Sequence, residues 1–250
     1  MQVVGYEAAV EGPAALRVAA DGAVRRETLA AGTDLAYALG ERHCAGAVDG
    51  EDHLACANPA APYCQEHAAD WPCARCRGNC DRPVEACHEE HAVYLAAFAP
   101  DRFKVGVTRS WRLERRLREQ GAERAAHVRT VSDGRIARRV EADIAEEVGD
   151  RVRVEEKIAG LHRGVDEAAW AALLAGFRVI DHYEFAYGLS LDRQPVPATL
   201  AAGTVRGTKG RVLVLDHHGT TYAVDMRGLV GHELERGAAG DRQASLAAFE

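Results

Sequence analysis

Seven cysteines fall within residues 44–87, and the 250-residue chain has no others. Two of them begin short motifs in which two residues separate a pair of metal-ligating side chains, here called knuckles. They are Cys-Gln-Glu-His at 64–67 and Cys-Ala-Arg-Cys at 73–76. Structural zinc is held by four soft ligands, commonly in pairs separated by two to four residues. The segment lacks the periodicity of an apolar core, so we expect it to fold around metal.

Seven cysteines and one histidine supply ligands for about two zinc ions. The simplest division is sequential: Cys44, Cys56, Cys64 and His67 hold one ion, and Cys73, Cys76, Cys80 and Cys87 hold the other. Interleaved pairing is equally allowed by the spacing, and the alternative ligands are His53, His88 and His91. A four-ligand site is closed, which makes its role structural.

Two other interpretations of the cysteines stay open. The spacing Cys-x2-Cys-x3-Cys at 73–80 also suits an iron–sulfur cluster. A set of buried free cysteines without metal is the second alternative. The histidine in the first knuckle favours zinc.

Composition narrows the class of protein. Apolar residues make up 47% of the chain and charged residues 28%, which excludes a disordered chain. The net charge of −7 does not indicate nucleic-acid binding, so such binding needs a local basic patch. One candidate is the stretch RSWRLERRLR at 109–118.

The chain shows no signal for export or membrane insertion. Glu7 and Glu11 interrupt the apolar character of the N-terminal stretch, which also lacks a basic start. The longest apolar run, 168–177, is too short to cross a bilayer. We therefore expect a cytoplasmic protein with no membrane partner, in which the cysteines stay reduced.

The predicted fold class is α+β. The predicted segments are an N-terminal β segment at 1–42, a cysteine-rich zinc module at 43–91, an α/β core at 92–195, a small C-terminal β unit at 203–234 and a flexible tail at 235–250. The first segment includes short strands and a turn of helix at 33–40. The C-terminal unit is predicted as a hairpin with strands at 211–215 and 221–226.

The predicted core begins with two strands, 92–99 and 103–108, joined by a turn at Pro100-Asp101. Ser110 is expected to cap a helix that ends at Gln120, with Gly121 just past its end. A third strand follows at 127–132.

Two further helices and a strand complete the predicted core. Asp133 is expected to cap a helix at 135–148, whose apolar residues recur every four positions. They are Ile136, Val140, Ile144 and Val148. Asp166 is expected to cap the next helix, and a strand follows at 178–187.

The hairpin and the helices after it resemble the core of the GIY-YIG nuclease superfamily. In that family the two strands carry the triplets Gly-Ile-Tyr and Tyr-Ile-Gly, a following helix carries an arginine, and a later helix carries a metal-binding glutamate. The corresponding triplets here are Ala92-Val93-Tyr94 and Lys104-Val105-Gly106. The fold implied is a small sheet with flanking helices.

The resemblance implies a catalytic set of Tyr94, Lys104, Arg116 and Glu141, with Arg112 as the alternative arginine. Glu141 would hold Mg²⁺ or Mn²⁺, which polarises the scissile phosphate. Arg116 would neutralise charge that develops on the phosphate, and Tyr94 would orient or deprotonate water. The other arginines are candidate nucleic-acid contacts: Arg109, Arg112, Arg115 and Arg118.

Two departures from the family pattern weaken the case for hydrolysis. Ala92 replaces the first glycine, and Lys104 replaces the second tyrosine, as in some members of the superfamily. The order of cysteine module and core, over about 40–195, also resembles a prokaryotic domain family of unknown function. The hypotheses are therefore a metal-dependent nuclease acting on DNA or RNA, a non-catalytic module that binds nucleic acid or protein, and a purely structural adaptor.

Overall fold

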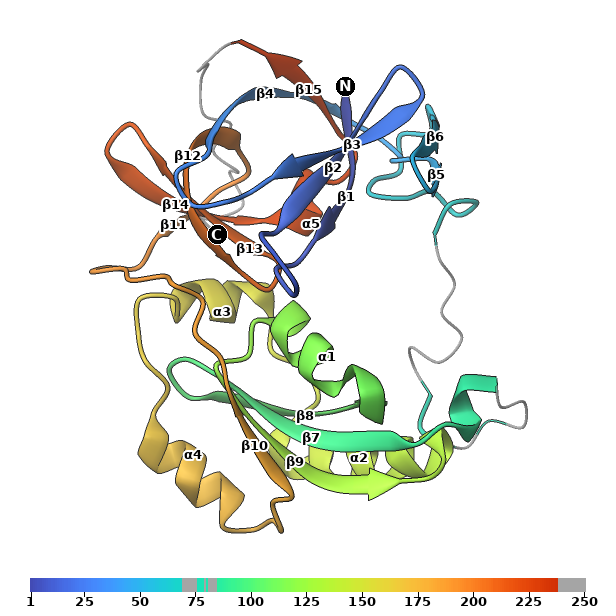
Figure 1. Ribbon diagram of the computed structural model, residues 1–250, viewed down its shortest axis with the longest axis vertical. Helices are drawn as coiled ribbons and strands as arrows, with labels where there is room; N and C mark the ends of the chain where they lie inside the picture. The colour runs from blue at the N-terminus through green and yellow to red at the C-terminus, as the bar shows by residue number, and fades with distance from the viewer. Residues whose placement is uncertain (69–75, 79, 81–84, 238–250) are drawn as a thin grey trace. The chain divides into compact units, whose positions relative to one another are not determined.

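The computed structural model describes residues 1–68, 76–78, 80 and 85–237 (Figure 1). The chain forms two compact units. The large-sheet unit comprises Met1–Ala69, Tyr187–Leu189 and Pro195–Glu250. The four-stranded unit comprises Asp70–Ala186 and Ser190–Gln194. No helix in the described ranges is long and apolar enough to span a bilayer.

Within the described residues, the large-sheet unit contains an 11-stranded sheet with the order β11-β14-β13-β12-β4-β15-β1-β2-β3-β6-β5. Its strands are β1 (Gln2–Glu7), β2 (Ala15–Ala20), β3 (Ala23–Thr28), β4 (Asp34–Arg42), β5 (Ala47–Asp49), β6 (Asp52–Leu54), β11 (Val196–Pro197), β12 (Ala201–Lys209), β13 (Val212–His217), β14 (Thr220–Asp225) and β15 (His232–Arg236). A short helix, α5 (Met226–Leu229), follows β14.

The large sheet curls around one apolar core. Val3 of β1 and Leu16 of β2 belong to the same buried cluster as Leu213 and Leu215 of β13 and Val224 of β14. These strands lie far apart in the strand order, so the two halves of the sheet must face each other to share a core.

Strands from both ends of the chain complete this sheet. Gln2 of β1 pairs with Glu233 of β15, and β4 lies between β15 and β12. The N-terminal segment and the C-terminal β unit, predicted separately, therefore share one sheet. Residues 235–236 of the predicted tail belong to β15, and 238–250 lie outside the described residues.

The helical turn predicted at 33–40 is wrong, because this stretch lies in β4. Burial alternates along its first residues, with Leu35 and Tyr37 buried between exposed neighbours. That period of two is the strand pattern, and pairing with β12 and β15 outweighs the helix propensity of its alanines.

The predicted C-terminal hairpin is confirmed. β13 and β14 pair from Val212↔Asp225 to His217↔Thr220. The two residues between them, His218 and Gly219, both have positive φ, which matches the right-handed twist of hairpin strands.

The four-stranded unit contains an antiparallel sheet with the order β10-β9-β7-β8. Its strands are β7 (His91–Phe98), β8 (Arg102–Arg109), β9 (Arg124–Val131) and β10 (Asp181–Glu184). Its helices in the described residues are η2 (Glu85–His88), η3 (Ser110–Arg112), α1 (Leu113–Gln120), α2 (Gly134–Val148), α3 (Val154–Ala159) and α4 (Glu167–Leu174). The predicted hairpin is confirmed, whereas the predicted strand at 178–187 is shorter and α3 was not predicted.

Helices α1 and α2 cover opposite faces of this sheet (Figure 1). Val93 and Leu95 of β7 pack in one core with Ala137 of α2 and Trp170 of α4. Because neighbouring strand residues point to opposite faces, Tyr94 lies on the other face. There its hydroxyl meets Gln120, the last residue of α1.

Most of the predicted helix ends are confirmed. The Asp133 carboxylate accepts from the Arg135 amide, Asp166 accepts from Ala168 and Ala169, and Gly121 ends α1 with a left-handed conformation. The predicted Ser110 cap is wrong. Ser110 begins η3, and its buried hydroxyl makes no hydrogen bond within the described residues.

The predicted apolar stripe of α2 needs one correction. Ile136 is 40% exposed, whereas Ala137 is fully buried. A spacing of four residues drifts around a helix of 3.6 residues per turn, which carries Ile136 off the packed face. Ala137 continues the stripe instead, together with Val140, Ile144 and Val148.

Candidate functional site

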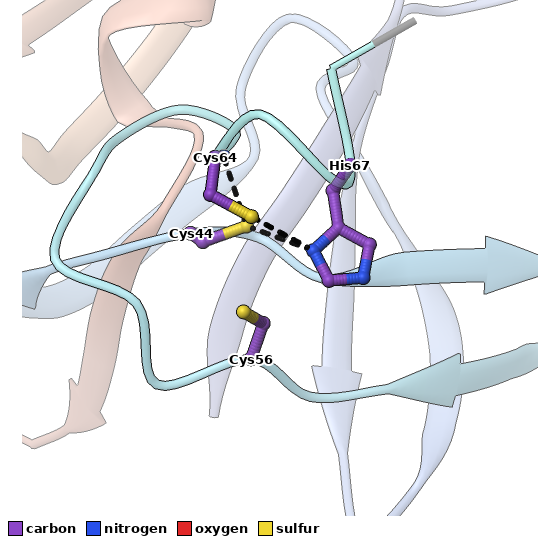
Figure 2. Close-up of side chains that lie close together, drawn as sticks. All are labelled: Cys44, Cys56, Cys64 and His67. Atoms are coloured by element: carbon purple, nitrogen blue, oxygen red, sulfur yellow. Dashed lines mark hydrogen bonds between the residues drawn. The ribbon is translucent and has the colours of Figure 1, made fainter.

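A metal centre is the first candidate site, formed by Cys44, Cys56, Cys64 and His67 (Figure 2). Their ligand atoms all lie within 4.8 Å of one another. His67 Nδ1 is 3.4 Å from Cys44 Sγ and 3.2 Å from Cys64 Sγ. Ligand atoms around a tetrahedral zinc ion are roughly 3.6 Å apart for sulfur and nitrogen, so this site could hold a metal such as zinc.

The backbone around Cys44 brings these ligands together. Cys44 follows the end of β4, and its amide donates to the Asn58 carbonyl at 2.8 Å. The Ala45 amide donates to the Pro62 carbonyl at 2.9 Å, which anchors the loop between Cys56 and Cys64. Gly46 has a φ of +69°, and a Cβ there would collide with the Leu54 carbonyl. The site therefore depends on a glycine at 46.

Hydrogen bonds to the Cys44 sulfur favour its thiolate. Burial alone would raise the pKa of this thiol, but the Cys64 and Gly46 amides donate to Sγ at 3.3 and 3.4 Å. The pKa of Cys44 is consequently lower than its ordinary value. Although the Asn58 amide favours the Cys56 thiolate, burial and the neighbouring sulfurs raise the pKa of Cys56. Closely spaced thiols of this kind ionise together only when a cation compensates them.

The predicted second site is only partly described. Cys76, Cys80 and Cys87 lie in the four-stranded unit, and Cys73 lies outside the described residues. The Gly78 amide donates to Cys76 Sγ at 3.3 Å. Of the alternative ligands, His53 bonds the Ala45 carbonyl. Within the described ranges, the first set is the only close group of three or more metal-ligating side chains.

Tyr94 is held against Gly106 and Gln120. Tyr94 pairs with Gly106 across the β7–β8 ladder and is 1% exposed. Gln120 Nε2 donates to the Tyr94 hydroxyl oxygen at 2.7 Å. Burial raises the pKa of Tyr94, while Arg116 and the Gln120 hydrogen bond act in the opposite direction.

Lys104 lies on the same face of the sheet as Tyr94, two residue pairs away along the ladder. Its ammonium donates to the Asp150 carbonyl at 3.0 Å, just past the end of α2. Burial and the nearby Arg116 lower the pKa of Lys104 to about 8, against the opposing effect of Glu141 and Asp150. The fold thus brings Lys104 within electrostatic reach of both Arg116 and Glu141.

Glu141 sits at the edge of the packed face of α2, and its side chain is 14% exposed. Arg138 donates to Glu141 Oε2 at 2.8 Å. Glu141 also affects the pKa of Tyr94 and of Lys104. The residues of the predicted catalytic set therefore lie close enough to influence one another.

The predicted nucleic-acid contacts already have carboxylate partners. Glu119 forms ion pairs with Arg112 at 3.6 Å, Arg115 at 3.1 Å and Arg116 at 3.5 Å. Arg109 pairs with Glu89 at 2.9 Å, and Arg118 pairs with Glu114 at 2.9 Å. Ion pairs near the surface contribute little to stability.

A cavity of about 350 Å³ lies between η3, α1 and the start of α2. Its arginines are Arg109, Arg112, Arg116, Arg135 and Arg138. Cys76, Cys87 and His91 also line it, and no described lining residue is acidic. Within the described residues, Arg135 Nε makes no hydrogen bond, although an Asp133 oxygen lies 3.5 Å away.

Arg135 and Arg138 were not predicted as site residues. They lie three positions apart in the sequence RIARRV, on one face of α2. Their spacing was the available signal, but only the folded sheet brings that face beside the arginines of η3 and α1.

Comparisons with known proteins identify a family whose function is unknown. A protein-family model described as "Protein of unknown function (DUF2797)" matches residues 56–185. The match bears out the expected resemblance to a domain family of unknown function, over a shorter range than predicted. No curated protein and no solved structure matches the chain. The GIY-YIG likeness stays a prediction.

Proposed function

The chain belongs to the DUF2797 family of proteins of unknown function, and we propose that it is a zinc-binding protein whose four-stranded unit binds nucleic acid. The contacts would be made to backbone phosphates in the arginine-lined cavity. The Cys44 centre would stabilise the large-sheet unit, without a part in the chemistry.

One observation carries the proposal: five guanidinium groups line a single cavity in which no described lining residue is acidic. Each of the five is also ion-paired with a carboxylate outside the lining, and Arg112 and Arg116 share Glu119. A phosphate in the cavity would compete with these carboxylates for the guanidinium groups. Phosphodiester oxygens match the planar, forked donors of arginine. The net charge of −7 makes such a local patch necessary, because the chain as a whole repels nucleic acid.

The test is the salt dependence of oligonucleotide binding, measured by fluorescence anisotropy. Wild type is compared with the double variant Arg135→Gln/Arg138→Gln. Arg151→Gln/Arg178→Gln is the matched control, because it removes the same charge from exposed positions outside the cavity. We expect the cavity variant to bind more weakly and its slope of log K against log salt to shrink by about 1.4.

The control should bind like wild type. Equal losses in both double variants would show that only net charge matters and would contradict a specific cavity. Failure of wild type to retain any oligonucleotide at low salt would leave the structural adaptor as the better interpretation.

Hydrolysis of the bound phosphodiester is a second candidate, favoured by the proximity of Tyr94, Lys104, Arg116 and Glu141. Arg116 lines the cavity and would stabilise charge on the phosphate. Tyr94 accepts a hydrogen bond from Gln120 and would orient the attacking water. Lys104, with its lowered pKa, is a second proton donor or acceptor on the same face.

A divalent ion would supply Lewis-acid activation of the phosphate. Glu141 is the residue that would hold it, as Mg²⁺ or Mn²⁺, with the remaining ligands water. Arg138 engages Glu141 through Oε2, which leaves Oε1 as the oxygen for the ion.

Cleavage of single- and double-stranded DNA and RNA in Mg²⁺ or Mn²⁺ tests this second candidate. Glu141→Gln should abolish cleavage, and Arg116→Ala should slow it by about 10²- to 10³-fold. Glu146→Gln is the control, because Glu146 is an exposed carboxylate on the same helix. Undiminished cleavage by Glu141→Gln would assign the activity to a contaminant or another site. Binding without any cleavage would favour the non-catalytic module.

A further inference from the structure

Trp111 is unusually exposed for its size. It is 68% exposed, although tryptophan is highly buried on average in folded proteins. It lies in η3 between Arg109 and Arg112, which both line the arginine-lined cavity. An aromatic ring therefore stands at the rim of a strongly cationic site.

The indole ring is held in place rather than free to rotate. Its Nε1 donates to Glu89 Oε2 at 2.9 Å, while Arg109 donates to the other oxygen of the same carboxylate at 2.9 Å. The Arg109 guanidinium lies 4.7 Å from the ring centroid, and that of Arg112 lies 5.8 Å away. The Trp111 and Arg109 hydrogen bonds lower the pKa of Glu89, which keeps this carboxylate ionised.

An exposed ring fixed in this way leaves apolar surface in water without gaining freedom of movement. A single exposed apolar side chain is common by itself, but this one lies beside two guanidinium groups that also line the cavity. Cations beside the ring also favour a ligand that combines a π-face with negative charge. Nucleotides combine the two.

We propose that Trp111 is a stacking platform for an unpaired base whose neighbouring phosphates lie in the arginine-lined cavity. The preferred ligand of the proposed nucleic-acid site is then single-stranded. This inference rests on the proposed function. A base within a duplex is already stacked on both sides, whereas an unpaired base is free to stack on an indole.

A protein partner is the competing occupant, because tryptophan and arginine are both enriched in protein interfaces. The cavity favours nucleic acid, since five arginines line it, although Glu89, Glu119, Asp133 and Glu141 pair with them from outside the lining. The two occupants differ in whether binding depends on the presence of a base.

The experiment uses the full-length protein and fluorescein-labelled 12-mers. The ligands are oligo-dT, an abasic strand with the same phosphates, and a duplex. The variants are Trp111→Ala, Trp111→Phe and the control Ile136→Ala, which truncates another exposed apolar side chain of the same unit. Dissociation constants are measured by anisotropy at one fixed salt concentration.

We expect wild type to bind oligo-dT more tightly than the abasic strand. Trp111→Ala should weaken oligo-dT binding by about 5- to 150-fold, the range for loss of one stacked base, and should not change binding of the abasic strand. Trp111→Phe should recover part of the loss. Ile136→Ala should match wild type on every ligand.

Failure of this inference is distinguishable from failure of the proposed function. Equal affinity of wild type for oligo-dT and the abasic strand, with no effect of Trp111→Ala, would overturn the stacking role but keep the phosphate site. Tighter binding of the duplex than of oligo-dT would overturn it as well. No binding of any 12-mer would overturn both proposals and favour a protein contact at Trp111.

Discussion

Gly106 lies directly across the β7–β8 ladder from Tyr94, and a Cβ at Gly106 would fall 2.5 Å from the Tyr94 hydroxyl oxygen. The phenol ring therefore occupies the space above the glycine. In this position the Tyr94 hydroxyl oxygen accepts a hydrogen bond from Gln120 Nε2 at 2.7 Å. The pair places a buried phenol beside Arg116, which lines the cavity.

Gly106→Ala should displace the Tyr94 ring and break its hydrogen bond with Gln120. Overpacking of this kind costs about 1–3 kcal/mol of folding free energy. Urea unfolding followed by tryptophan fluorescence measures it, because Trp170 is buried in the same unit. Gly164→Ala is the control, since a Cβ at Gly164 would have no atom within 4 Å. Equal stability of the two variants would contradict the steric role of Gly106.

Lys104 should make the stability of the four-stranded unit depend on alkaline pH. Its folded pKa of about 8 lies below the ordinary 10.5, so the unfolded chain binds more protons between these values. Stability therefore rises with pH from about 8 to 10.5. Urea unfolding of wild type and Lys104→Met at several pH values tests this. Wild type should gain stability relative to the variant across that window, and parallel pH curves would refute the lowered pKa.

His67→Ala should remove one equivalent of zinc from the purified protein, because His67 Nδ1 faces two of the cysteine sulfurs. His53→Ala is the matched control, because His53 Nε2 bonds the Ala45 carbonyl instead. Elemental analysis gives the content, expected at about two equivalents in wild type. Unchanged zinc in His67→Ala would rule out this ligand set, and a brown, iron-containing protein would favour an iron–sulfur cluster.

Metal removal should loosen the loop between Cys56 and His67 first. The structure joins this loop to the end of β4 through the Cys44 and Ala45 amides, and the metal would supply the remaining constraint. Hydrogen exchange should therefore increase in peptides covering 55–68 after chelation, while β7 and β8 stay protected. Full protection of 55–68 in metal-free protein would show that the loop folds without the ion.

Local sequence signals were sufficient to predict much of the secondary structure of the four-stranded unit. Two kinds of feature depend only on residues close in sequence: the strand pair β7 and β8, and the helix caps at Asp133 and Asp166. The periodicity of apolar residues and the chemistry of capping residues were therefore enough to predict them. The same reasoning failed at β4, where alanines suggest a helix and pairing with β12 and β15 decides otherwise. Pairing between distant strands leaves no local signal.

Prediction of the candidate sites was limited in the same way, because residues distant in sequence come together in them. Cysteine spacing gave the ligands of the first metal centre as the simplest division, but it equally allowed interleaved pairing, and only the folded chain brings these four side chains together. The cavity was not foreseen, because only the folded chain brings Arg135 and Arg138 of α2 beside Arg112 and Arg116. Nor did the arginine run at 109–118 show that Glu119 pairs with Arg112, Arg115 and Arg116.

The sheet built from both ends of the chain has a consequence for synthesis on the ribosome. Residues 91–184 emerge before β12 and β15, so the four-stranded unit has all its strands while β4 lacks both of its partners and β1 is paired only with β2. We expect apolar side chains of the N-terminal strands, such as Val3 and Leu35, to stay exposed to solvent until the later strands are synthesised. The ligands of the first metal centre are complete by His67, so an ion bound early could hold the ends of β4 and β6 together during that interval. Protease digestion of ribosome-stalled chains about 190 residues long, with and without zinc, would reveal such early protection, and identical digestion would argue against it.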